Sequence, residues 1–191
     1  MKKVEIISAI LGDAMLPLVG FLFWDWGFYF IALFFLFDLV IRTLFLNKKL
    51  ALLPSIVFPK GFFVKSVVLA ALEIALLHFL SYVSLKPIIF TDEIWAFLSY
   101  EELGIAQGFL LLPLLFFNEV IRLRNEKKVG TPQNVRFEIL KNSQLVGLVR
   151  IVFWSILIFG SCLFSVSETA LVVLLILMLS VQPFWIYRNM A

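Results

Sequence analysis

The sequence predicts an all-α, polytopic integral membrane bundle of six transmembrane helices with both termini cytoplasmic. Three observations predict it: 62% of the 191 residues are hydrophobic, only 15% are charged, and the mean hydropathy is +1.04. Soluble domains have roughly 50% apolar and about 25% charged residues. Backbone polar groups inside lipid must be satisfied within their own segment, so helices are expected in place of isolated strands. We expect residues 1–191 to form a single transmembrane helical domain.

Six windows have about the 20 mostly apolar residues that a helix needs to cross a bilayer, and each is bounded by charge, proline or asparagine. The expected spans are residues 4–23, 28–46, 62–85, 104–121, 145–164 and 169–187. Residues 24–27 and 165–168 are short enough to be tight turns between neighbouring spans. No cleavable signal is expected, because the first apolar stretch is long and contains Asp13.

The charges on the connections predict the orientation, since cytoplasmic loops collect Lys and Arg. Cations lie before the first span, between the second and third, between the fourth and fifth, and after the sixth; they include Lys2, Lys3, Arg42, Lys48, Lys49, Lys60, Lys65, Arg122, Arg124, Lys127, Lys128 and Arg188. The other side has one cation, Lys86. We therefore expect a multi-pass protein of the cell (inner) membrane. Its basic loops would face anionic lipid headgroups, which explains the pI of about 9.1 without a nucleic-acid partner.

Three connections are more than turns. Residues 50–63 are apolar but interrupted by Pro54 and Pro59, so we expect a cytoplasmic flap that does not cross the bilayer. Thr91 can cap an outer interfacial helix near residues 92–103, whose apolar face would include Trp95 and Phe97. Residues 135–140 alternate between apolar and polar, which fits either a strand or a short amphipathic piece.

The first hairpin resembles an uncharacterised prokaryotic family of small multi-span membrane proteins, known only as a domain of unknown function. The residues that carry the resemblance are Pro17, Leu18, Val19, Gly20, Phe21, Leu22, Phe23, Trp26 and Asp38. The family hairpin reads Pro-Leu-x-Gly, then Phe, Trp and an aromatic followed by Glu-Asn; here Asp38 and Leu39 stand where that Glu-Asn would be. The match covers about the first quarter of the chain. The resemblance implies a membrane bundle and no particular chemistry.

Four ionisable residues fall inside the expected spans, on four different helices: Asp13, Asp38, Glu73 and Arg150. Such a residue costs about 2.5 to 3.5 kcal/mol at the bilayer centre, so each requires a reason. All four lie between the midplane and the inner leaflet, which predicts a shared polar cluster. One interpretation is a functional site, with Arg150 as the counter-ion and Glu73 or Asp13 protonated. The other is interhelical attachment, in which Arg150 pairs with one acid and the other acids stay neutral.

Secondary candidates accompany this cluster. Asp38 with Arg42, and Glu119 with Arg122, have the spacing of ion pairs along one helix at the membrane boundary. Gln182 lies in the inner half of the sixth span. Outside this set, Trp154 falls in the middle of a span, an exception to the interfacial positions that tryptophan favours. His78, which is the sole histidine, is expected to hydrogen-bond a carbonyl or hydroxyl group. Cys162, the sole cysteine, is expected to pack as a small apolar residue.

The sequence contains no catalytic, phosphate-loop, zinc or haem motif, so we expect neither an enzyme nor a cofactor or metal. Two hypotheses for function remain. In the first, a proton or small solute is passed or sensed through the intramembrane cluster. In the second, the chain is an accessory or scaffold subunit of a larger membrane complex, or a homo-oligomer, and the charges serve folding alone.

Overall fold

The computed structural model describes residues 14–53, 61–85, 88–101, 107–128 and 133–186. These residues form helices, with no strand among them. The helices are a short one, Ala14–Phe23, then α2 (Phe28–Leu50), α3 (Phe62–Ser84), α4 (Phe90–Ser99), α5 (Gln107–Lys128), α6 (Gln133–Leu163) and α7 (Glu168–Ile186). The prediction of an all-helical chain is confirmed for this part of the protein.

Four of these helices, α2, α3, α6 and α7, are long and apolar enough to cross a membrane. They correspond to the second, third, fifth and sixth expected spans. The first expected span is described only from Ala14 onward, so Asp13 lies outside the described residues. The fourth corresponds to α5, whose last third is charged and which contains Pro113. A total of six spans, and the side on which the termini lie, remain predictions.

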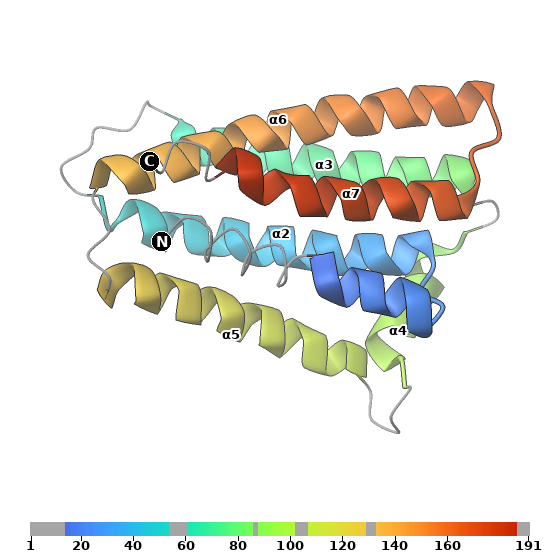
Figure 1. The fold of residues 1–191 in the computed structure, drawn as a ribbon, viewed down its shortest axis with the longest axis horizontal. Helices are drawn as coiled ribbons and strands as arrows, with labels where there is room; N and C mark the ends of the chain where they lie inside the picture. The colour runs from blue at the N-terminus through green and yellow to red at the C-terminus, as the bar shows by residue number, and fades with distance from the viewer. Residues whose placement is uncertain (1–13, 54–60, 86–87, 102–106, 129–132, 187–191) are drawn as a thin grey trace.

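The four long helices form a closed ring. α2 packs against α3 and α7, and α6 packs against the same two helices. α5 and α4 pack against α2 and against each other, on the side of α2 away from α6 (Figure 1). The ring therefore has an interior of its own, to which α4 and α5 are an attachment.

One half of the ring interior is a dry core. Its fully buried side chains come from all four helices and include Phe28, Ile31, Leu77, Leu80, Trp154, Leu171, Val172 and Leu175. At this end the first turn of α2 is capped across the ring, because Glu168 Oε1 accepts the backbone N–H of Phe28 at 2.8 Å. The packing of large aromatic and aliphatic groups leaves this end closed.

The link before α2 depends on a close approach between a glycine and an indole ring. A Cβ on Gly20 would lie 2.1 Å from the ring of Trp26, which is buried at 3% exposure. Trp26 in turn packs on Phe30 and Tyr100, at ring centroid distances of 4.6 and 6.0 Å. A larger residue at position 20 would displace the Trp26 indole from its contacts with Phe30 and Tyr100.

The outer helix near residues 92–103 differs in its bounds and in its buried face. α4 begins earlier, at Phe90, and ends at Ser99. Phe97 is fully buried against Phe30 and Phe37, whereas Trp95 is 64% exposed and does not belong to the packed face. A second aromatic contact joins α4 to α2, because Phe90 packs on Tyr29 with ring centroids 5.6 Å apart.

The helix that contains the fifth expected span begins before that span, and the segment leading to it is helical and not a strand. α6 runs unbroken from Gln133, so residues 135–140 are helical. Helix propagation adds one hydrogen bond per residue once a helix is nucleated, which favours this extension into the polar flank. Tertiary bonds support it: Gln144 donates to the Phe62 carbonyl at 2.9 Å and to Ser66 Oγ at 2.6 Å.

Cys162 is exposed, and the expected packing role for it is wrong.

Candidate functional site

A buried polar cluster joins α3, α6 and α7 inside the ring. Arg150 donates from Nε to Glu73 Oε1 at 2.6 Å and from Nη2 to Glu73 Oε2 at 2.9 Å. Its third nitrogen, Nη1, donates to Gln182 Oε1 at 2.8 Å. Trp154 Nε1 donates to Glu73 Oε1 at 3.1 Å. A paired guanidinium and carboxylate in this geometry form the strongest hydrogen bonds that side chains make.

Four hydrogen bonds join these side chains to one another. Glu73 is 1% exposed, Gln182 4% and Arg150 8%, so little water reaches them. Both Glu73 oxygens accept bonds from donors, as an ionised carboxylate does, and all three Arg150 nitrogens donate. The guanidinium also lies 5.3 Å from the centre of the Phe35 ring on α2, across the interior. Glu73 and Arg150 thus form an ion pair in which both carboxylate oxygens are bonded.

Helical spacing explains why these side chains meet. Arg150 and Trp154 are one turn apart on α6 and lie on the same face, so both reach the Glu73 carboxylate. On α3 the buried residues Leu69, Glu73, Leu77 and Leu80 share a face by the same spacing. Gly147 opens space between the two helices, because a Cβ there would meet only Leu69 Cδ1, at 4.0 Å.

A cavity of about 160 Å³ lies beside this cluster, in the half of the ring away from the dry core. Phe35, Glu73, Arg150 and Gln182 form its deep part. The other lining residues lie nearer the ends of the helices. Those residues are Asp38, Leu39, Arg42, Thr43, Leu46, Lys49, Ser66, Leu69, Ala70, Arg122, Ile139, Leu140, Ser143, Gln144, Gly147 and Ile186. The ring interior is thus hollow and polar on one side of the Glu73–Arg150 pair and filled on the other.

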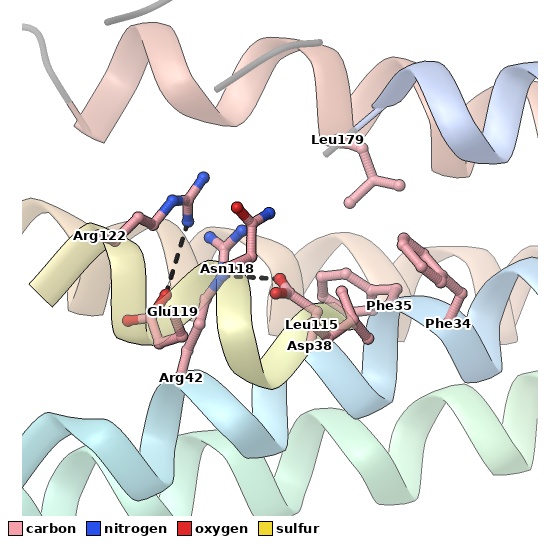
Figure 2. Close-up of a pocket in the computed structure, with 9 residues that line it drawn as sticks. All are labelled: Phe34, Phe35, Asp38, Arg42, Leu115, Asn118, Glu119, Arg122 and Leu179. Atoms are coloured by element: carbon pink, nitrogen blue, oxygen red, sulfur yellow. Dashed lines mark ion pairs between the residues drawn. The ribbon is translucent and has the colours of Figure 1, made fainter. Parts of the chain in front are cut away.

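A second group of charges connects α2 to α5. Arg42 Nε lies 2.7 Å from Asp38 Oδ2, as the spacing within α2 predicts. Glu119 contacts Lys49 of α2, and its second oxygen lies 3.8 Å from Arg122 Nη1. Figure 2 shows Arg42 and Asp38 facing Arg122 and Glu119, with Asn118 between them, around a small pocket lined by α2, α5 and α7. These ion pairs attach α5 to the ring.

The cavity and this small pocket are neighbours. Phe35, Asp38, Arg42 and Arg122 line both of them. The pair formed by Asp38 and Arg42 therefore lies between the cavity of the ring and this small pocket. Asp38 does not contact Glu73 or Arg150 through any bond described above, but it shares their cavity.

The remaining sequence candidates have separate places. His78 Nδ1 lies 2.8 Å from the Ile74 carbonyl on its own helix, and its ring packs on Tyr29 and Phe90. Sequence reasoning did not assign roles to Trp154, Lys49 or Gln144. For Trp154 the sequence did offer a signal: a tryptophan in the middle of a span needs a hydrogen-bond partner for its N–H. Nothing local distinguishes Lys49 from Lys48, its neighbour in the last turn of α2.

The described residues contain no group of three or more His, Cys, Asp or Glu side chains that could hold a metal ion. Comparisons of the chain with known proteins found no matching family model, no matching curated protein and no matching solved structure. The function must therefore be argued from the cavity and its charges.

Proposed function

We propose that this protein is a six-span, multi-pass protein of the inner membrane, with both termini cytoplasmic, that admits a small polar solute into the ring interior in order to pass or sense it. The observation that carries the proposal is the asymmetry of the interior. A polar cavity leads to the Glu73–Arg150 pair, and a dry core of fully buried side chains lies beyond it. Such a half-open interior is what a solute site with access from one side requires.

The basic loops support a cytoplasmic opening. Lys48 and Lys49 lie in the last turn of α2, and Arg122 and Arg124 lie near the end of α5. All four are at the same end of the bundle as the cavity. Cations gather on cytoplasmic connections. The cavity would then face the cytoplasm, and the capped end at Glu168 would face outward.

The contacts of Glu73 favour a solute over a proton as the species that is passed or sensed. A proton relay needs a carboxyl group that exchanges its proton readily. Here each Glu73 oxygen accepts at least one hydrogen bond from a donor, including two from the Arg150 guanidinium. Protonation would break this pairing, so Glu73 serves better as a fixed end to the cavity.

Cysteine accessibility tests the proposal directly. In a Cys162→Ala background, Ala70→Cys places a thiol on the cavity wall, whereas Ala71→Cys places it at the same depth on the exposed outer face of α3. A membrane-impermeant thiol reagent should modify Ala70→Cys from the cytoplasmic side of inverted vesicles. Ala71→Cys should stay unmodified, because a thiolate does not form in hydrocarbon.

Labelling of neither residue from either side would overturn the proposal. Labelling of Ala70→Cys from the outer side only would overturn the orientation and keep the cavity. If Ala70→Cys is unreactive and a partner protein copurifies stoichiometrically in gentle detergent, the accessory role is the better account.

A further inference from the structure

The charged side chains that line the cavity are already paired with charges of opposite sign. The pairs are Glu73 with Arg150, Asp38 with Arg42, and both Lys49 and Arg122 with Glu119 of α5. An ion entering the cavity would lose its hydration and would then compete with a partner that is in place. A neutral solute has neither cost. The cavity therefore favours an uncharged solute.

Neutral hydrogen-bonding side chains line the cavity at one level. They are Thr43 of α2, Ser66 of α3, and Ser143 and Gln144 of α6. Each lies about two helical turns from the residue of its own helix that forms the deep end, which is Phe35, Glu73 or Arg150. Because these helices run side by side (Figure 1), the four polar side chains have a similar depth. They form a polar wall between the deep end and the ends of the helices.

This polar wall can both donate and accept hydrogen bonds. Thr43 Oγ1 donates to the Leu39 carbonyl at 2.7 Å and keeps its lone pairs as acceptors. The bonds that Gln144 makes to Phe62 and Ser66 both use its amide nitrogen, and its amide oxygen is an acceptor. Ser143 is exposed, and its hydroxyl has one donor and two acceptor sites. A solute bearing hydroxyl groups matches such a mixture, because each hydroxyl is itself a donor and an acceptor.

The size of the cavity limits what fits. Sites for drug-sized ligands have volumes of about 300 to 1,000 Å³. At roughly 30 Å³ per water molecule, 160 Å³ corresponds to about five waters. The space thus suits a solute with about as many non-hydrogen atoms as glycerol.

We propose that the cavity binds a small, neutral, polyhydroxy solute of the size of glycerol through the hydroxyl and amide groups of Thr43, Ser66, Ser143 and Gln144. The Glu73–Arg150 pair closes the deep end of this site. The inference rests on the proposed function and deepens it, because it names the class of solute that is passed or sensed.

Three solutes of one carbon skeleton test the class: glycerol is neutral, glycerate is an anion, and aminopropanediol is a cation at neutral pH. Ala70 lies one turn from Ser66 on the same face of α3, so a bound solute should shield Ala70→Cys from methyl methanethiosulfonate, a small neutral reagent. Glycerol at about 0.2 M should slow this labelling about threefold, as expected for so small a ligand with a dissociation constant of the order of 0.1 M. At matched ionic strength, each ionic analogue should slow it much less.

A variant of the polar wall tests the residues. Thr43→Val/Ser143→Ala removes two hydroxyl groups while keeping every charge and nearly the same shape. In this variant Ala70→Cys should still react, and glycerol should no longer slow the reaction. Ser155→Ala is the matched control, because Ser155 is an exposed serine of α6 that bonds to its own helix and does not line the cavity. Protection by glycerol should persist in the control.

Three results would contradict the inference: protection by an ionic analogue that equals protection by glycerol, protection by none of the three solutes, or full protection in Thr43→Val/Ser143→Ala. Any of these, with Ala70→Cys still labelled by the impermeant reagent from the cytoplasmic side, would leave the cavity of the proposed function in place and remove only its ligand class. A thiol at position 70 that no reagent modifies would remove the proposed function as well.

Discussion

The two charge clusters of this protein use the same residue types in opposite ways. Glu73 and Arg150 lie inside the ring, with side-chain exposures of 1% and 9%, and every nitrogen of the guanidinium is bonded. Between α2 and α5, Glu119 is just as buried at 3%, but its partners Lys49 and Arg122 are 17% and 30% exposed. Depth decides how completely a charge must be paired, because unpaired charge is costly where water is excluded.

The two clusters therefore have different roles in the protein. In the inner pair both Glu73 oxygens are bonded to Arg150, so the pair links α3 to α6 at the deep end of the cavity. In the outer group Glu119 contacts both Lys49 and Arg122, whose side chains are partly exposed. Substitutions in the two clusters should therefore differ both in their effect on stability and in their dependence on salt.

The largest expected effect is at the inner pair. Glu73→Leu removes the only carboxylate bonded to Arg150 in the described residues and leaves a buried cation, which should lower the free energy of unfolding by about 3 kcal/mol. The measurement is unfolding in mixed detergent micelles. The double variant Glu73→Leu/Arg150→Met should recover most of the loss, since it removes both charges. If the double variant is as unstable as the single one, packing rather than charge holds this site.

A smaller effect is expected at Trp154. Trp154→Phe keeps an aromatic ring in the core but removes the N–H bonded to Glu73, and the expected loss is about 1 to 2 kcal/mol. Trp185→Phe is the matched control, because Trp185 is 47% exposed on α7 and should tolerate the change. Equal losses at the two positions would mean that the bond to Glu73 contributes nothing specific.

The smallest effect is expected for the pair on α2. Asp38→Asn/Arg42→Gln removes two partly exposed charges together and should cost less than about 1 kcal/mol. The contribution of this pair should also fall as salt is added, whereas the effect of Glu73→Leu should not. Unfolding at low and high salt measures both. A salt-independent loss as large as that of Glu73→Leu would place the α2 pair in the dry interior as well.

Most helices could be predicted from the sequence because their positions follow from hydropathy. The expected starts of the second and third spans, at Phe28 and Phe62, match α2 and α3. Helix ends were less predictable: α6 begins at Gln133, and in the part that precedes the expected span Asn142 and Gln144 bond to neighbouring helices, through the Ile186 and Phe62 carbonyls. Bonds of this kind depend on which helices are neighbours, and that information is not local.

The candidate site divides in the same way. Glu73 and Arg150 stand out in the sequence because charge is expensive inside a span, and Asp38 and Arg42 because their spacing fits one helix face. The contact of Lys49 with Glu119 joins residues 70 positions apart, and no periodicity could select that lysine. The bond from Trp154 to Glu73 likewise required the packing of α6 on α3.

The amino-acid sequence alone thus determined that this is an apolar, helical chain with a few expensive charges, since both properties follow from composition and spacing. Only the tertiary structure decided that α2, α3, α6 and α7 close into a ring, that Glu73, Arg150 and Gln182 meet within it, and that a cavity lies on one side of them. The physical reason is that a helix face fixes the direction of a side chain, whereas the partner it reaches depends on the packing of the other helices.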